Sequence, residues 1–424
     1  MSEALTLPVP EAGIAGEDAS LKRLETRNMR HLVHDRAYYG IASAGGQFMT
    51  LYALYFGATA AHLGWIASLP GLMMFIATFL SVAWRGRYAT SASAQVLPSL
   101  LGRLSFILPL FTPLVPTGWQ IPYLVAVLVL PALPNGIATS LGLAVMQESV
   151  RSEQMVTLLS RRQVALNLFN GAMVLGLGAW LAQAPFPQNY QSMFVLTGGA
   201  ALMSWWHINQ TRPLFSPQAH SAVRPRLSWR RVLNDSLNIW REPRFQQVAR
   251  VVGSLYVVHY LIIAIVPLYL VQALNADERL MAWYGMATLA GGTLGAWGIG
   301  RAKRRWQTRL SSPVLMLWGM LVGALGAFML ILSPVIWLAL ASGLLTGAAW
   351  TLADIGQFSY FTEQAPKEDA TPYSSAYLQV LSLALFISPL PASWLAEGGV
   401  SLVLLIGVGA GLRALHALWL WRRL

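Results

Sequence analysis

Four long windows of this sequence contain no Asp, Glu, Lys or Arg, and this pattern constrains the fold more strongly than any other feature. Each window is roughly twice the ~20 apolar residues that cross a bilayer core as a helix. Each also has turn-forming residues near its middle, such as Gly57-Ala58 and Ser333-Pro334, so each predicts two helices joined by a short turn. The four windows are residues 37–84, 104–147, 163–211 and 310–353.

The composition agrees with a membrane protein. Charged residues make up 11% of the chain and the mean hydropathy is +0.52, whereas soluble domains carry about 25% charged residues. Four shorter apolar windows each have the length of one spanning helix. The sequence therefore predicts an all-α polytopic membrane protein with twelve transmembrane helices. The shorter windows are residues 251–276, 280–300, 370–396 and 400–412, the last extending towards Trp421.

Lysine and arginine gather in one set of loops, which sets the orientation of the helices. The opposite loops contain Arg279 as their one clear cation. Since basic loops stay on the cytoplasmic side, both termini are predicted to be cytoplasmic. The net charge of +12 is therefore a topology signal, and no nucleic-acid partner is expected. The basic loops are residues 85–87, 151–162, 212–250, 301–309 and 422–423.

Residues 1–28 are polar and lack an apolar core, so they predict a flexible cytoplasmic tail and not a signal peptide. The chain has no cysteine, which excludes disulfide and thiolate chemistry. Because the sequence shows no organelle-targeting pattern, the simplest location is the plasma (inner) membrane of a prokaryote, with the chain crossing it many times.

Three landmarks recur along the chain at nearly one spacing, which indicates an internal repeat. The repeat predicts two pseudo-symmetric six-helix bundles, residues 29–211 and 247–424, joined by a cytoplasmic linker at residues 212–246. The recurring pairs are Trp65 and Trp283 at 218 positions, Arg85 and Arg301 at 216, and the charged runs 148–153 and 363–368 at 215.

The linker contains apolar residues at helical spacing after Ser228, which is suited to cap a helix. They predict an amphipathic helix that lies along the inner leaflet of the membrane. The alternative is a helix that packs on cytoplasmic loops, and in both cases the helix tethers the two bundles. The apolar residues are Trp229, Val232, Leu233, Leu237 and Trp240.

With this organisation the chain resembles the major facilitator superfamily (MFS) of secondary transporters over about residues 29–421. The runs at 54–58 and 60–70 carry the resemblance, together with the charged segments after the fourth and tenth helices. The loop after the second helix departs from the family pattern Gly-x-x-x-Asp-Arg-x-Gly, since only Arg85-Gly86-Arg87 stands there. The fifth helix also lacks the Gly-Pro motif of many antiporters. The resemblance implies an MFS fold and alternating access, without a cofactor, but no drug-antiporter subclass.

Ionisable residues inside the predicted helices are candidates for function, because charge within a bilayer is costly. His259 lies near the middle of the seventh helix, and Asp354 lies in the inner half of the tenth. Both are candidates for proton coupling, since imidazole titrates near neutral pH and a carboxylate can exchange protons or pair with a cationic solute. The alternatives are a neutral, hydrogen-bonded histidine and an anion neutralised by a nearby arginine. Arg103 is expected to reach the interface, and Arg413 is expected to be structural.

Polar and aromatic residues on the helices that line the central cavity in this superfamily are the candidate substrate-binding residues. The resemblance places the site near the membrane midplane between the two halves. For each residue, a hydrogen bond between helices is an equally good interpretation. The candidates are Gln47, Asn135, Asn167, Asn170, Tyr256, His259, Tyr260, Trp350 and Asp354.

Charged residues after the fourth and tenth helices predict a cytoplasmic gate, in which opposite charges on the two halves pair when the inner side closes. The alternative is a set of solvated loop charges of little energetic value. The gate candidates are Glu148, Arg151, Glu153, Arg161, Arg162, Glu363, Lys367 and Glu368.

No enzyme is predicted, because the chain lacks paired catalytic acids, a nucleophile motif and a phosphate-binding loop. The group His31-x-x-His34-Asp35 has no further ligand nearby, so no metal and no cofactor are expected. The predicted function is a monomeric secondary active transporter that moves a small organic solute, coupled to protons, with export favoured over import. The alternatives are an uncoupled facilitator and a non-transporting protein of the same fold that acts in assembly or in pigment or lipid delivery. Membrane lipids are the other expected partners.

Overall fold

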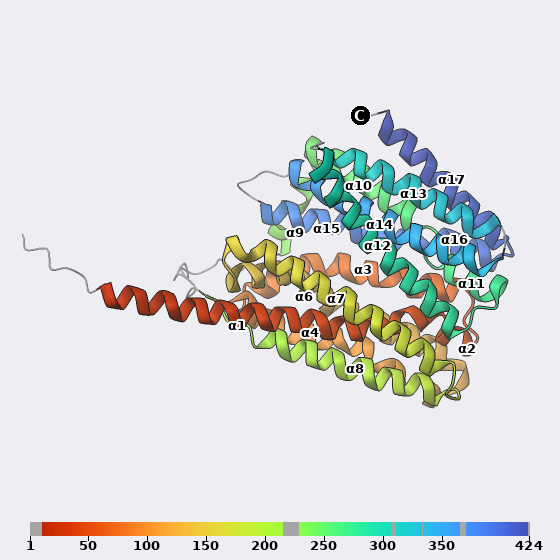
Figure 1. The fold of residues 1–424 in the computed structure, drawn as a ribbon, viewed down its shortest axis with the longest axis horizontal. Helices are drawn as coiled ribbons and strands as arrows, with labels where there is room; N and C mark the ends of the chain where they lie inside the picture. Colours follow the sequence, from red (N-terminus) through yellow and green to blue (C-terminus); the bar gives the residue numbers. More distant parts are fainter. Residues whose placement is uncertain (1–10, 215–228, 307–310, 333, 365–369, 423–424) are drawn as a thin grey trace, which may run out of the picture.

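The computed structural model describes residues 11–214, 229–306, 311–332, 334–364 and 370–422. These residues form helices and connecting turns without a strand, as the sequence predicts. In Figure 1 the segments up to α8 lie in the lower half of the molecule, and α10 to α17 lie above them. The helices of both layers run roughly along one direction, which is the arrangement of a polytopic membrane protein.

Nine helical segments in the described part of the chain are long and apolar enough to cross a membrane. Three further long segments, which contain α1, α8 and α12, lie alongside them. Glycine, tryptophan and polar residues lower their hydropathy, although Gly and Trp are common in membrane helices. All-α polytopic architecture is confirmed, whereas the number of twelve spans and the side of the termini stay predictions.

The first layer contains the elements before the linker. Helix α1 packs against α7 and α8, while α6 packs against both α3 and α4. The elements are α1 (Glu11–Ser43), η1 (Ala44–Phe48), α2 (Met49–Tyr55), α3 (Ala60–Arg85), α4 (Ser91–Arg103), η2 (Leu104–Phe106), η3 (Leu108–Leu114), η4 (Thr117–Trp119), α5 (Gln120–Val129), α6 (Ala132–Ser149), α7 (Ser152–Leu181) and α8 (Gln188–Asn209).

The second layer contains the elements after the linker helix α9 (Trp229–Arg241). Helix α14 packs against α12 and α13, and α17 packs against α13 and α10. The layers meet where α7 packs on α12 and where α3 packs on α15 and α16. The elements are α10 (Pro243–Tyr260), α11 (Ile265–Leu274), α12 (Glu278–Trp306), α13 (Ser312–Leu332), α14 (Ile336–Gln364), α15 (Ala370–Ile387), α16 (Pro389–Glu397) and α17 (Leu402–Trp421).

Helix boundaries repeat between the layers with the offset seen in the sequence. Helix α3 begins at Ala60 and α12 at Glu278, which is 218 positions later. Helix α6 ends at Ser149 and α14 ends at Gln364, which is 215 positions later. The bundle boundaries predicted from the sequence remain a proposal that these offsets support.

The segment expected as a flexible cytoplasmic tail, residues 1–28, contains the start of α1, which is helical from Glu11. The last residues of this segment dock on the first layer, while its flexibility stays a prediction. Asn28 is fully buried, and its side-chain amide donates to the carbonyl oxygens of Ser149, at 2.9 Å, and Arg212, at 2.7 Å. Glu25 accepts a hydrogen bond from the Arg151 N–H at 2.8 Å. Residues 1–10 lie outside the described residues.

The predicted linker helix exists as α9, and it packs against α15, α10 and α3. The Trp240 indole N–H donates to the Gln379 side chain at 2.8 Å. The Gln379 amide in turn donates to Ser236 at 3.3 Å. These contacts support a helix that docks on the second layer, while contact with lipid remains a proposal.

Glycines allow α12 and α14 to cross with their backbones in contact. A Cβ atom on Gly347 would lie 1.8 Å from the Thr288 carbonyl oxygen, and one on Gly291 would lie 1.8 Å from the Leu344 carbonyl oxygen. Close approach through small residues is a usual way to pack membrane helices. This crossing holds two walls of the cavity described below.

Gly347→Ala should therefore destabilise the protein, because the added methyl group forces the two backbones apart. Overpacking of this kind costs about 1–3 kcal/mol. Gly298→Ala on α12 is the matched control, since nothing lies within 4 Å of its added Cβ, and its effect should stay below about 0.5 kcal/mol. Thermal unfolding of both variants in detergent checks this, and equal melting temperatures would contradict the close crossing.

Candidate functional site

Two helix breaks face the space between the layers and occupy equivalent positions in the repeat. The first is η1, where Gly45-Gly46 interrupts the rod formed by α1 and α2. The second is the segment 261–264 between α10 and α11. It begins 217 positions after the start of η1 and ends 216 positions after the end of η1. A short 3₁₀ stretch within a longer helix commonly marks a functional site, and transporters build their binding sites at discontinuous helices.

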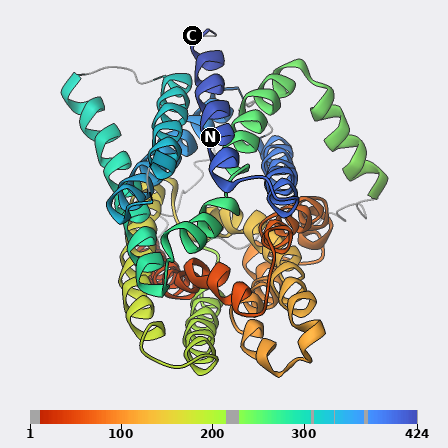
Figure 2. The same ribbon diagram turned by 90° about the vertical axis from the view of Figure 1, so that its right-hand side faces the viewer.

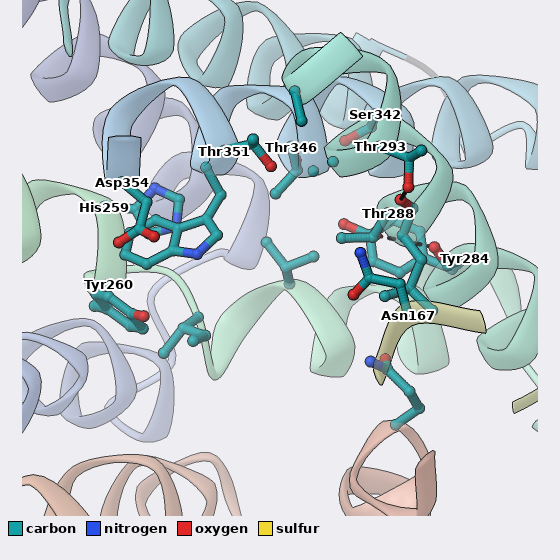
Figure 3. Close-up of a pocket in the computed structure, with 18 of the residues that line it drawn as sticks. Asn167, His259, Tyr260, Tyr284, Thr288, Thr293, Ser342, Thr346, Thr351 and Asp354 are labelled. Carbon is teal, nitrogen blue, oxygen red and sulfur yellow. Dashed lines mark hydrogen bonds between the residues drawn. The ribbon is translucent and has the colours of Figure 1, made fainter. Parts of the chain in front are cut away.

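A cavity of about 900 Å³ lies between these breaks and is lined by both layers. Its volume is in the range of small-molecule sites. Figure 3 shows Asp354, His259 and Tyr260 at one end of the cavity, and Asn167, Tyr284 and Thr288 at the other. Six of the predicted substrate-binding residues line it: Gln47, Asn167, His259, Tyr260, Trp350 and Asp354.

The other three predicted residues lie in helix contacts. Asn135 packs against Gly102, where α6 meets α4. Asn170 on α7 donates to the Gly40 carbonyl oxygen at 3.2 Å and to the Ser43 hydroxyl at 2.8 Å, which joins α7 to α1. Tyr256 is 9% exposed and stands behind Trp350, with ring centroids 5.4 Å apart. Sequence alone does not separate such contacts from a cavity lining.

The sequence prediction missed hydroxyl residues that line the cavity. Two of them, Ser342 and Thr346, precede the predicted Trp350 and Asp354 on α14 at intervals of four residues, so all four lie on one face. This spacing was a signal that could have found them. The remaining hydroxyl residues of the lining are Ser160, Tyr284, Thr288, Thr293 and Thr351.

The buried Arg413 at this cavity is held in part by the carbonyl oxygen of His259. The helix break directs the Ile263 N–H to the Tyr260 carbonyl oxygen, at 3.1 Å. The His259 carbonyl oxygen instead accepts from the Arg413 guanidinium at 2.7 Å. A second Arg413 nitrogen donates to the Gly323 carbonyl oxygen at 3.1 Å, and the residue is only 3% exposed. Arg413 therefore ties α17 to α10 and α13.

A second charged cluster is buried inside the first layer. The Asp35 carboxylate lies 3.5 Å from Arg103 and 3.5 Å from Arg162, and it accepts a 2.7 Å hydrogen bond from Ser204. Arg103 also lies over the Tyr39 ring, 5.1 Å from its centroid. Arg103 was expected at the interface, but it is 8% exposed because Asp35 provides a buried partner.

The two layers are pinned together at the end of the molecule that is predicted to face outward. The Tyr55 and Tyr190 hydroxyls of the first layer donate to Glu278 of the second, at 3.0 and 3.1 Å. The Ala61 N–H, at the start of α3, donates to Glu397 at 3.2 Å. A carboxylate at a helix N-terminus is favoured by the helix dipole. These contacts join the two layers at this end of the molecule.

At the opposite end, Glu148, Arg162 and Glu363 of the predicted gate contact residues of their own layers. Glu148 pairs with Arg85 at 3.2 Å, and Glu363 accepts from Ser312 at 2.5 Å. Arg162 belongs to the Asp35 cluster. The side chains of Glu153, Lys367 and Glu368 lie outside the described residues. Arg151 and Arg161 line a separate pocket with Lys22, Glu25, Arg30 and His34.

A match to a family model accords with this architecture. The model of the Major Facilitator Superfamily matches residues 37–389, so the chain belongs to this family. No curated protein sequence matches the chain. Within the described residues, no group of three or more His, Cys, Asp or Glu is placed to hold a metal ion.

Solved structures share the fold at low sequence identity. A variant of the nucleoside transporter NupG is 9% identical, with a TM-score of 0.69, covering 94% of this chain and 99% of that one. The xylose transporter XylE from E. coli, in a partially occluded inward open conformation, is 15% identical, with a TM-score of 0.67 and coverage of 94% and 99%. A POT family transporter in complex with a thioalcohol conjugated peptide is 11% identical, with a TM-score of 0.68 and coverage of 93% and 96%. The protein is thus a multi-pass membrane protein with the fold of a transporter.

Proposed function

We propose that this protein is a secondary active transporter that moves a small organic solute by alternating access and couples the movement to protons. The family and its solved structures indicate a transporter, with a small-molecule solute and surrounding lipid as partners. The observation that carries the proposal is a cavity lined by both layers, together with contacts of Tyr55 and Tyr190 with Glu278 that join the layers at one end of the molecule. If the two ends of the cavity open in turn, a solute bound in it is carried across the membrane.

Proton coupling is assigned to Asp354 and His259 because both line the cavity. Asp354 is exposed to the cavity, and its Oδ1 atom accepts from the Gln357 amide at 2.8 Å. His259 packs on Trp350, with ring centroids 4.5 Å apart. An ionisable group within a membrane helix is a default candidate for a proton pathway.

Proteoliposomes that contain a pH-sensitive dye test the coupling. Addition of a solute selected in a thermal-shift screen should move protons in the natural protein, and Asp354→Asn should abolish this movement. Phe358→Leu is the control on the same helix, because Phe358 is 57% exposed and does not line the cavity. Solute movement without proton movement would instead identify the uncoupled facilitator. A co-purifying partner and no flux of any solute would support the non-transporting alternative.

We propose that charged residues at the cytoplasmic end close it when the outer end opens. The candidates whose side chains the structure describes are Glu148, Arg151, Arg161, Arg162 and Glu363. Glu148, Arg162 and Glu363 contact residues of their own layers. Export is favoured over import, because the helices are rich in tryptophan and apolar residues. The proposed location is the plasma (inner) membrane of a prokaryote, and the proposed assembly is a monomer.

A further inference from the structure

Three aromatic rings, those of Tyr256, Tyr260 and Trp350, pack together at one end of the cavity and are here called the cage. The Trp350 ring centroid lies 5.4 Å from those of Tyr256 and Tyr260, with interplanar angles of 71° and 80°. The two tyrosine rings lie 5.2 Å apart at 31° to each other. The three rings therefore pack against one another, and the Trp350 ring also contacts His259, with ring centroids 4.5 Å apart. Aromatic faces are electron-rich and attract organic ammonium groups.

A carboxylate stands beside the cage with one oxygen available. Asp354 follows Trp350 by four residues on α14, so the two side chains lie on the same face of the helix. Oδ1 of Asp354 accepts from Gln357. Oδ2 accepts no hydrogen bond from the residues that the structure describes. An exposed carboxylate next to electron-rich rings creates a local attraction for a positive charge.

The positive charge nearest this end does not offset that attraction for a solute. Arg413 is 3% exposed, and its guanidinium donates to the carbonyl oxygens of His259 and Gly323. Arg413 also lines the cavity, and its Nε donates no hydrogen bond within the described residues, but the Arg413 side chain is buried whereas Asp354 is exposed. A solute therefore meets the acidic group more readily than the basic one, which disfavours an anionic solute.

The far end of the cavity differs in chemistry. Thr288 and Thr293 on α12 and Asn167 on α7 are at that end in Figure 3, and Leu289 and Val266 add apolar surface to the lining. A solute that spans both ends would place its cationic group in the cage. Its uncharged part would contact hydroxyl, amide and aliphatic groups.

We propose that the solute is an organic cation, whose ammonium group binds against Tyr260 and Trp350 and pairs with Asp354. Tyr256 supports the cage from behind. This inference rests on the proposed function, because it assigns a substrate class to the same cavity. An exposed carboxylate beside the cage favours a cationic solute over a neutral sugar.

Three probes with the same phenol ring and different charge test the proposal: tyramine, the neutral alcohol tyrosol and the anion 4-hydroxyphenylacetate. Equilibrium dialysis on detergent-purified protein should show tyramine binding at least tenfold more tightly than the other two. Asp354→Asn should remove this preference, and Trp350→Leu should weaken tyramine binding about tenfold. Phe358→Leu should bind tyramine as the natural protein does, and size-exclusion profiles establish that each variant is folded.

Equal or tighter binding of tyrosol or the anion would overturn the proposal, as would a preference that survives in Asp354→Asn. Failure of tyramine to bind the folded natural protein would also count against it. The proposed function is tested separately by the distances between spin labels at the two ends of the molecule. This measurement requires no solute. A protein whose ends alternate but which prefers tyrosol would retain the transport function and lose the cationic substrate class.

Discussion

Asp35→Ala should cost about 3–5 kcal/mol of unfolding free energy, because it leaves two buried guanidinium groups without their shared carboxylate. Asp35 is 2% exposed and lies 3.5 Å from both Arg103 and Arg162. Its partner Ser204 would also lose a 2.7 Å hydrogen bond. Titration of the purified protein with SDS in mixed micelles measures the change.

Two comparisons make this prediction specific. Asp277→Ala removes an exposed carboxylate that accepts the Leu280 N–H at 2.8 Å, and loss of such a helix cap costs only about 1 kcal/mol. Asp35→Ala combined with Arg162→Met removes one of the two uncompensated charges, so it should recover part of the stability. A smaller loss in Asp35→Ala than in Asp277→Ala would show that the buried cluster does not stabilise the first layer.

Glu278→Ala should open the end of the molecule that Glu278 now closes. The substitution removes the acceptor of two tyrosine hydroxyls, at 3.0 and 3.1 Å, that belong to the opposite layer. Each hydrogen bond to a charged group contributes about 1.5–3 kcal/mol. A loss of about 3 kcal/mol would shift the ratio of closed to open forms by roughly 100-fold. The predominant conformation should therefore change.

Spin labels measure this opening without interference, because the chain has no cysteine. Gln188 at the start of α8 and Gln272 near the end of α11 are exposed and lie on the two layers. The distance between labels at Gln188→Cys and Gln272→Cys should lengthen in Glu278→Ala. Asp277→Ala is the matched control, since the Asp277 side chain caps the start of α12 by accepting from the Leu280 N–H, and the substitution should leave the distance unchanged.

The sequence predicts the helical rods well, because they depend on local composition. Absence of charge over 37–84 and 310–353 favours helices within the membrane. The helix break at η1 was not predicted, although it contains Gly45-Gly46, and Pro131 lies between α5 and α6. Glycine gives the backbone conformational freedom and proline removes an N–H donor, and both effects belong to the chain segment itself.

The partners of buried polar groups are not local, and this is where the sequence predictions reach their limit. Arg103 was assigned to the interface because no sequence pattern links it to Asp35, which is 68 positions away. Asn170 and Asn167 are equally plausible cavity residues by helical position, yet Asn170 joins α7 to α1 and Asn167 lines the cavity. Glu278 lies between the predicted windows 251–276 and 280–300, and no sequence pattern links it to its tyrosine partners on α2 and α8.

A second label pair at the opposite end, added to the Glu278→Ala experiment, tests alternating access most directly. Thr157 on α7 and Thr362 on α14 are exposed on the two layers at the end that is predicted to face the cytoplasm. When the distance between Gln188→Cys and Gln272→Cys lengthens, the distance between Thr157→Cys and Thr362→Cys should shorten, as the two layers rock about the cavity. Lengthening at the outer pair with no change at the inner pair would contradict transport by alternating access.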